Sequence, residues 1–370
     1  MDEKRNALLT VGLVCAVLFV LGVADLCNSD RVYSESENRV LASRPVFSWE
    51  SLLSGKYGDE EYMSDQFTGR DKWVGIKTRA DILFRKKEIN GVYLGSDHYL
   101  IGVNDPEEYT QQMEDSRIVS LKKLVNRWDA KVMLVPTADN ILTDKLPAFA
   151  PCYDETGLLA KVKESVGEEH YIDVYSALQE HAGEPVYYRT DHHWTSLGAY
   201  YGFLAWADSM GKFPYPYNTA GMKTVSEDFQ GTLQSRINQD WTKDTIQYFP
   251  ETEKKPVSVT YDFADTADSL YAPEYLETKN QYGFFLNDNH AFIEIQTGYN
   301  AGKTLFVIKD SYANSMIPLL TAHYETIYVV DLRYFNGKLF QLMEQYEPEQ
   351  GMDVLVLYDC IHFLEDFKFY

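Results

Sequence analysis

The chain has 370 residues, and its 56 acidic against 34 basic side chains give a formal net charge of −22 at pH 7. This length suffices for one large domain with its own core and an accessory segment. The strong negative charge argues against nucleic acid and against anionic lipid headgroups as ligands, because both would be repelled.

The N-terminal segment is apolar enough to enter a membrane. After a tail of residues 1–6, residues 7–27 are almost wholly apolar and long enough to cross the hydrocarbon layer as a helix. Lys4 and Arg5 precede this span, so the positive-inside rule keeps the N-terminus in the cytoplasm. We therefore expect a single-pass protein of the cell membrane with an extracytoplasmic C-terminal domain. A signal peptide cut after Ala24, which would give a secreted protein, is the alternative.

The next part of the chain predicts a small, mostly helical segment. Residues 28–49 are polar and show no period, as expected of a stem that leads away from a membrane. Residues 50–127 follow, and the elements expected within them are helices at 50–73, 71–84 and 104–127 and a hairpin at 90–101.

Residues 128–370 predict an α/β domain. Short continuous apolar runs separated by helical stretches indicate a mostly parallel sheet with helices on both faces. Residues 218–282 are polar and irregular, and we expect an insertion or long loop there that acts as a lid or substrate wall. The strands expected in this domain are 130–135, 171–174, 186–188, 304–308, 326–330 and 352–358.

The four cysteines are Cys15, Cys27, Cys152 and Cys360. No pair has the spacing of metal ligands, so neither a zinc site nor a disulfide framework is indicated. A single bridge between Cys152 and Cys360 is left open.

An acid, two imidazoles and an indole stand in a row at Asp191, His192, His193 and Trp194. They lie between an expected strand and a helix at 195–206, which Thr195 or Ser196 would cap. In an extended turn Asp191 and His193 project to one side, about 6–7 Å apart at Cα, and His192 points the other way. A carboxylate that orients an imidazole is the base half of a Ser-His-Asp triad. Helix capping by a self-satisfied polar cluster is the simpler alternative.

A nucleophile for this pair is available at Ser311. The strand expected at 304–308 is followed by Asp310, Ser311 and a helical stretch, which would expose the serine hydroxyl above the sheet. The backbone N–H groups that open the helix are placed to stabilise an oxyanion. The alternative is that Asp310 or Ser311 only caps this helix.

The two motifs together resemble the bacterial DHHW protein family, which is similar to the SGNH-hydrolase-like proteins of alginate O-acetylation. The resemblance runs from about Asp65 to the C-terminus, and further pieces that carry it are 65–70, 91–95, 136–137, 284–289 and 331–334. It implies an SGNH-like three-layer α/β/α domain in which the Asp-x-His element precedes the serine.

The resemblance also implies roles for individual residues. Ser311 becomes the nucleophile, His193 the general base and Asp191 its orienting acid. Lys309 stands where ordinary SGNH enzymes have glycine, and residues 286–289 contain no glycine where an oxyanion donor is expected. The remaining donor candidates are the Ser311 N–H with Asn289 or Asn314. The neighbours expected to support the two motifs are Asp310, Tyr312, His192 and Trp194.

The implied activity is serine-dependent acyl transfer outside the cytoplasm. It would be O-acetylation, or deacetylation, of a cell-surface or secreted polysaccharide, and a membrane-bound acyltransferase partner would supply the acetyl groups. We expect no cofactor and no metal, because ligands from the three consecutive residues 191–193 do not readily converge on one ion. The alternative function is a non-catalytic carbohydrate-binding or assembly protein of the cell envelope. A palmitoyltransferase of the Asp-His-His-Cys kind is excluded, because Trp194 stands in the place of the cysteine.

Overall fold

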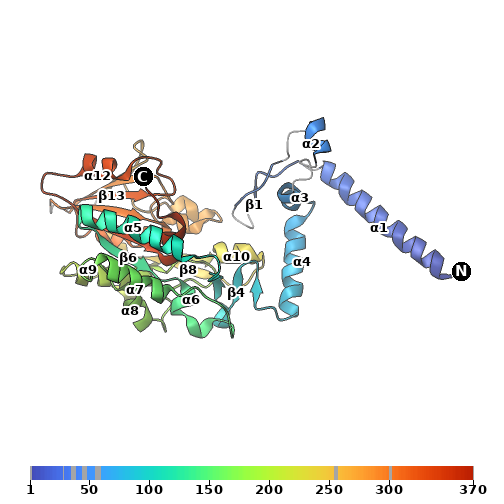
Figure 1. Cartoon of the computed structure of the whole chain (residues 1–370), viewed down its shortest axis with the longest axis horizontal. Helices are drawn as coiled ribbons and strands as arrows, with labels where there is room; N and C mark the ends of the chain where they lie inside the picture. The colour runs from blue at the N-terminus through green and yellow to red at the C-terminus, as the bar shows by residue number, and fades with distance from the viewer. Residues whose placement is uncertain are drawn as a thin grey trace. The chain divides into compact units, whose positions relative to one another are not determined.

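The computed structural model describes residues 2–27, 29–34, 39–43, 48–54, 60–253, 257–299 and 302–369. The chain divides into two compact units (Figure 1). One unit comprises residues 1–86 with 235–240, and the other comprises residues 87–234 with 241–370.

The first unit begins with a long apolar helix. Helix α1 (Asp2–Cys27) contains the span Lys4–Ala24, whose mean hydropathy of 2.7 makes it long and apolar enough to cross a membrane, as an anchor or as a signal sequence. Its orientation stays a prediction. The other elements of the unit are β1 (Tyr33–Ser34), β2 (Arg39–Val40), α2 (Trp49–Leu53), α3 (Glu60–Gln66) and α4 (Arg70–Leu83). Residues 28, 35–38 and 44–47 of the expected stem lie outside the described residues.

The second unit is built on a seven-stranded sheet with the order β10-β9-β11-β13-β12-β14-β6. Its strands are β6 (Lys131–Val135), β9 (Val257–Tyr261), β10 (Asp265–Ala267), β11 (Phe292–Thr297), β12 (Thr304–Lys309), β13 (Thr326–Asp331) and β14 (Asp353–Asp359). Strands β13, β12, β14 and β6 are parallel to one another, whereas β10, β9, β11 and β13 pair antiparallel. The sheet is therefore mixed, and the expectation of a mostly parallel sheet was wrong.

Helices cover both faces of this sheet. Leu305 and Val307 of β12 enter one core cluster, and Phe306 and Ile308 enter the other, as the alternation of side chains along a strand requires. The first cluster also contains residues of α6 (Ala138–Ile141), α8 (Val174–Glu180), α9 (Ser196–Ser209) and α11 (Ile317–Leu320). The second contains residues of α5 (Gln111–Trp128), α7 (Glu155–Val166), α12 (Leu339–Tyr346) and α13 (Cys360–Asp366). All residues of β12 are buried because helices cover both faces of the sheet, and this explains why its sequence contains a continuous apolar run without alternation.

Smaller elements complete the unit. Strands β3 (Glu88–Ile89), β4 (Val92–Leu94) and β5 (Leu100–Gly102) form an antiparallel sheet in the range where a hairpin was expected. Strands β7 (Lys223–Phe229) and β8 (Asp244–Tyr248) pair with each other, and α10 (Thr232–Ile237) lies between them in the chain.

Three expectations about elements were wrong. Residues 171–174 form no strand, because Tyr171 makes a single bridge to Val132 and the Asp173 carboxylate then caps α8. Residues 186–188 contribute only the bridge from Tyr187 to Trp194. Residues 218–282 are not irregular: they contain β7, α10, β8, β9 and β10, although residues 254–256 lie outside the described part.

The carboxyl ends of the parallel strands meet at one edge of the sheet. Asp310 and Ser311 follow β12, Asp359 ends β14, and Thr137 comes shortly after β6. In open α/β sheets, ligands bind at this kind of edge. Cys152 and Cys360 are both free thiols, so the bridge left open by the sequence is not formed.

Candidate active site

The Asp-His-His-Trp motif lies in a loop that is closed by backbone hydrogen bonds. The Tyr188 N–H donates to the His193 carbonyl at 3.2 Å, and the Thr195 N–H donates to the Val186 carbonyl at 2.9 Å. Helix α9 then begins at Ser196, with the Thr195 hydroxyl accepting from the Gly198 N–H at 3.2 Å. The cap expected from the sequence is therefore Thr195, and the motif is held at a helix entrance.

Ser311 lies directly after β12, at the start of the 3-10 helix η8 (Ser311–Ser315). The Asp310 carboxylate caps this helix by accepting from the Tyr312 N–H at 2.8 Å. Asp310 therefore caps this helix, and the Ser311 hydroxyl stays available for other contacts. The Ser311 N–H is the first of the helix and has no acceptor within it.

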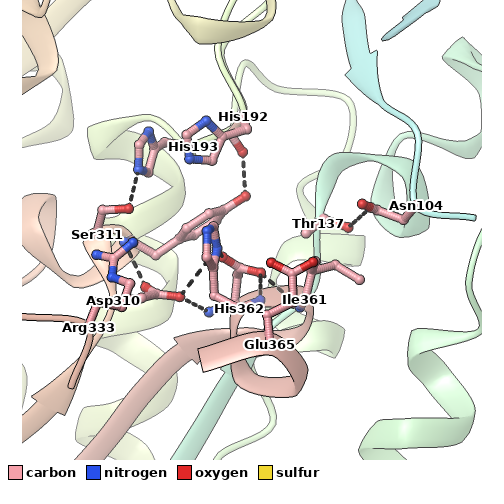
Figure 2. Close-up of polar contacts among 12 residues, drawn as sticks. Asn104, Thr137, His192, His193, Asp310, Ser311, Arg333, Ile361, His362 and Glu365 are labelled. Carbon is pink, nitrogen blue, oxygen red and sulfur yellow. Dashed lines mark hydrogen bonds and ion pairs between the residues drawn. The ribbon is translucent and has the colours of Figure 1, made fainter. Parts of the chain in front are cut away.

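The fold brings the two motifs into direct contact. The Ser311 hydroxyl lies 2.8 Å from Nε2 of His193 (Figure 2). On the other side of the ring, Nδ1 of His193 lies 2.6 Å from Oδ1 of Asp191. Ser311 and His193 are 118 residues apart in the chain. All three residues are at least 95% buried. The result is one continuous row of hydrogen bonds from hydroxyl to imidazole to carboxylate.

Further donors hold Asp191 in its ionised form. The His193 N–H donates to Oδ1 at 3.0 Å, and the backbone N–H and hydroxyl of Thr232 donate to Oδ2 at 2.8 and 3.1 Å. Burial alone would raise the pKa of Asp191, but the imidazoles His192 and His193 and these hydrogen bonds hold that pKa well below its usual value. A carboxylate keeps the proton of His193 on Nδ1, so Nε2 is free to accept the proton of Ser311.

The His193 ring is sandwiched between two other rings. Tyr282 of the 3-10 helix η7 (Gln281–Phe284) stacks on it with centroids 3.8 Å apart and planes 9° apart, and His192 lies at 3.9 Å with a tilt of 37°. The expectation that His192 points away from His193 was wrong, because the loop bends at these residues instead of staying extended. The Tyr282 hydroxyl also donates to the Ser311 carbonyl at 3.2 Å. Tyr282 therefore contacts both partners of the central hydrogen bond.

Trp194 and Tyr312 connect the Asp-His-His-Trp motif to the segment that carries Ser311. The Trp194 Nε1–H donates to the Tyr312 carbonyl at 2.8 Å, and the Tyr312 hydroxyl donates to the His192 carbonyl. Both rings are fully buried. These two bonds fix the separation between the segment that carries His193 and the segment that carries Ser311.

Lys309 is fully buried directly before the Asp310–Ser311 pair, and its ammonium donates to the side-chain oxygens of Asn289 and Asn314, at 2.8 Å each. It also lies 3.3 Å from Asp331, which forms a two-bond pair with Arg333. The oxygens of both amides face the ammonium, so their NH₂ groups point elsewhere. Burial lowers the pKa of Lys309, although Asp331 opposes this. The assignment of Asn289 or Asn314 as an oxyanion donor stays a prediction.

The turn that precedes Asn289 has an unusual backbone. Leu286, Asn287 and Asp288 all have left-handed φ angles, of 58°, 57° and 70°. For Leu286 this conformation costs roughly 1–2 kcal/mol, whereas Asn and Asp adopt it more readily. Strain of this kind is concentrated at functional sites. The turn places the Asp288 carbonyl 3.5 Å from the Asn314 amide nitrogen.

A second acid–imidazole pair lies beside the first motif. The Asp359 carboxylate accepts from Nδ1 of His362, and the Asp359 N–H donates to Oδ2 of Asp310 at 2.7 Å (Figure 2). Burial and the neighbouring Asp359 charge raise the pKa of Asp310 to about 8. The charge of Asp359 in turn raises the pKa of His362 to about 10. This pair was not predicted from the sequence, although an Asp-x-x-His spacing directly after a strand is visible there.

Three groups of residues within the described ranges have ligand atoms close enough to share a metal ion: Asp191, His192 and His193; Asp310, Asp359 and His362; and His362, Glu365 and Asp366. In the first group, Oδ1 of Asp191 and Nδ1 of His193 are bonded to each other, and Nδ1 of His192 lies 2.8 Å from the Thr232 hydroxyl. Those atoms are engaged in hydrogen bonds, which fits acid–base chemistry better than metal ligation.

Comparison with known proteins places this site in a family. The family model described as DHHW protein matches residues 130–330, more than half of the chain. The chain belongs to the DHHW protein family. This match includes the Asp-His-His-Trp motif and Ser311, so the resemblance seen in the sequence is confirmed.

Solved structures with TM-scores near 0.6 share the fold of this chain. A DHHW family protein from Eubacterium siraeum is 25% identical, with a TM-score of 0.61 over 75% of this chain and 93% of that chain. PatB1 of Bacillus cereus, whose structure carries a sulfonyl adduct, is 18% identical, with a TM-score of 0.60 over 75% of this chain and 97% of that one. The O-acetyltransferase domain of Pseudomonas putida AlgJ is a more distant likeness, at 15% identity and a TM-score of 0.44 over 74% and 92% of the two chains. None of the curated proteins matches the chain.

Proposed function

We propose that this DHHW protein is an extracytoplasmic, SGNH-like serine acyltransferase that O-acetylates a cell-surface or secreted polysaccharide. Ser311 is the nucleophile, His193 the general base and Asp191 the acid that orients it. The observation that carries the proposal is the unbroken row of hydrogen bonds from the Ser311 hydroxyl through His193 to Asp191. A buried row of this order is the geometry that nucleophilic serine catalysis needs.

The first half of the reaction forms an acetyl-serine. The Ser311 oxygen attacks the carbonyl carbon of an activated acetyl ester or thioester, and its proton passes to Nε2 of His193. The Asp191 carboxylate stabilises the imidazolium that results. The tetrahedral oxyanion is held by the Ser311 N–H at the start of η8, with Asn289 or Asn314 as the second donor. Collapse expels the leaving group, which takes the proton from His193.

The second half transfers the acetyl group. A polysaccharide hydroxyl attacks the serine ester while His193 accepts its proton, and the Ser311 oxygen leaves and recovers that proton. Water in place of the sugar hydroxyl gives hydrolysis at the same site. A membrane-bound acyltransferase partner would deliver the acetyl groups to a protein held at the membrane by α1.

Release of p-nitrophenol from p-nitrophenyl acetate tests the proposal. We expect kcat/KM to fall about 10³–10⁴-fold in Ser311→Ala and in His193→Ala, and to fall strongly in Asp191→Asn, because the three groups act as a unit. Ser120→Ala, at a partly exposed position of α5, is the matched control and should keep the unmutated rate. Phenylmethylsulfonyl fluoride should label Ser311 covalently.

Two outcomes would contradict this function. Turnover that survives Ser311→Ala would remove the serine from its role. A folded protein with neither turnover nor serine labelling would favour the alternative, a carbohydrate-binding protein of the envelope without catalysis.

A further inference from the structure

Two imidazoles beside the acid–base pair are not used by the mechanism above. The rings of His192 and His362 lie 6.1 Å apart, with a tilt of 45°. Their side chains are 32% and 26% exposed, whereas those of His193 and Asp191 are 6% and 2% exposed. The two rings are therefore reachable from solvent. Figure 2 shows His192 next to His193, the buried imidazole that contacts the Ser311 hydroxyl.

The hydrogen bonds of His192 determine which of its nitrogens carries a proton. Nδ1 of His192 lies 2.8 Å from the Thr232 hydroxyl, which lies 3.1 Å from Oδ2 of Asp191. The hydroxyl has one proton, and it donates to the ionised carboxylate because that bond is charge-assisted. Nδ1 of His192 must then be the donor to Thr232. Partial burial and the neighbouring His193 lower the pKa of His192, so the ring is neutral at pH 7 and its Nε2 is an acceptor.

His362 has the opposite character. Its Nδ1–H donates to Asp359, and Asp310 is 3.9 Å away. The Asp359 charge raises the pKa of His362, so the ring is an imidazolium at neutral pH and its Nε2–H is also a donor. Among the residues that the structure describes, this second N–H has no hydrogen-bond partner.

Nε2 of His192 accepts and Nε2–H of His362 donates, and a neutral hydroxyl group can bind both. A hydroxyl group donates and accepts at once, so its two hydrogen bonds of ordinary length can join two imidazoles whose ring centroids lie 6.1 Å apart. An anion would need donors on both sides, and the carboxylates of Asp359, Glu365 and Asp366 close to His362 would repel it. A cationic group would be repelled by the imidazolium itself.

We propose that His192 and His362 form an acceptor subsite that binds the hydroxyl adjacent to the one being acetylated. The inference rests on the proposed acyl transfer and assigns its acceptor to a chemical class: a polyol with vicinal hydroxyls, as in a pyranose ring. One hydroxyl attacks the Ser311 ester and gives its proton to Nε2 of His193. Its neighbour donates to Nε2 of His192 and accepts from Nε2–H of His362, which orients the ring for attack.

The test is the partition of the acetyl group between alcohols and water. The full chain in detergent is given p-nitrophenyl acetate with either trans-1,2-cyclohexanediol or cyclohexanol, at equal hydroxyl concentration. The ratio of acetylated alcohol to released p-nitrophenol is measured by mass spectrometry and absorbance. This ratio is independent of any loss in the rate of acylation. We expect the diol to give a ratio about tenfold higher, as a hydrogen bond to a charged group can provide.

Variants then test whether His362 causes the preference for the diol. His362→Phe should reduce the diol ratio to that of cyclohexanol, and His362→Gln, which restores a neutral N–H donor, should recover part of it. His181→Gln is the matched control, because His181 belongs to another acid–imidazole pair, 2.8 Å from Glu184, and should leave rate and ratio unchanged.

The outcomes separate the two proposals. No p-nitrophenol release by the unmutated protein would contradict the acyl-transfer function and the subsite with it. Release without a diol preference, or a preference that persists in His362→Phe, would overturn the subsite alone. A preference abolished by EDTA would assign the position to a metal ion and also overturn it.

Discussion

Each of the four consecutive residues Asp191, His192, His193 and Trp194 makes a different kind of contact. The Asp191 carboxylate binds Nδ1 of His193, and the His192 ring lies over that imidazole at a tilt of 37°. Nε2 of His193 contacts the Ser311 hydroxyl, and the indole of Trp194 donates to the carbonyl of Tyr312. Because each of these four side chains makes a contact of its own, a substitution at any of them would remove one contact of the site. The contacts of Tyr282 on the other face of His193 complete this arrangement and limit rotation of the ring.

The pair of Asp359 and His362 predicts a pH dependence of stability. Asp359 raises the pKa of His362 to about 10 in the folded protein, against 6.5 for an unperturbed histidine. Such a group contributes its full stabilisation below the unfolded pKa and loses it as the pH rises toward the folded value. We therefore expect His362→Phe to lower the thermal midpoint of the full chain by roughly 5 °C at pH 6, and by much less at pH 10, as measured by scanning calorimetry.

The control for this measurement is His181→Phe, which removes a more exposed imidazole paired with Glu184. A partly exposed pair of this kind contributes little, so its midpoint should shift by no more than about 1 °C. An equal loss for His362→Phe at both pH values would contradict the charge assigned to His362.

For single residues, the sequence predicted those contacts of the site whose partners both lie in motifs. It did not predict the contacts made by residues outside the motifs. The spacing of Asp191 and His193 and the position of Ser311 after a strand predict contacts that the structure contains. Thr232 and Tyr282 come from a stretch read as a long loop, where neither period nor motif marks them. Only the folded chain brings their side chains to Asp191 and His193.

At the scale of elements, the turn between β7 and α10 supports the motif loop. An added Cβ at Gly231 would lie 2.2 Å from Cβ of Asp191 and 2.4 Å from its Oδ2. We therefore expect Gly231→Ala to displace Asp191 and to reduce kcat/KM for p-nitrophenyl acetate by about 10²-fold, the usual result of a misplacement near 1 Å. Gly183→Ala is the control, because no atom lies within 4 Å of its added Cβ. A folded Gly231→Ala protein with unchanged turnover would show that Asp191 tolerates this displacement.

Some strands of the sheet can be predicted from the sequence, and others cannot. Strands β6, β12, β13 and β14 are buried on both faces, so continuous apolar runs mark them. Strand β9 alternates Val257, Val259 and Tyr261 with Ser258 and Thr260, a signal of period two that a search for continuous runs passes over. Because β9 and β11 were not recognised, the antiparallel half of the sheet was not predicted.

For the whole molecule, the net charge and the proposed membrane attachment bear on which partners we expect. The net charge of −22 opposes the approach of polyanions and does not affect neutral polymers. This agrees with a hydroxyl-binding subsite in preference to an anion-binding one. An apolar α1 would keep such an enzyme close to polymers assembled at the cell surface.

The last prediction concerns the direction in which α1 crosses the membrane. Lys4 and Arg5 precede the span, and Cys27 is exposed at its far end. In a Cys152→Ser background, we expect a membrane-impermeant maleimide to label Cys27 in intact cells and to leave Cys15, within the span, unlabelled. The protein should stay in the membrane fraction after an alkaline carbonate wash, with an intact mass that includes residues 1–24. Cys27→Ser is the control. Labelling only after lysis would reverse the orientation, and a soluble protein that lacks residues 1–24 would identify α1 as a cleaved signal peptide.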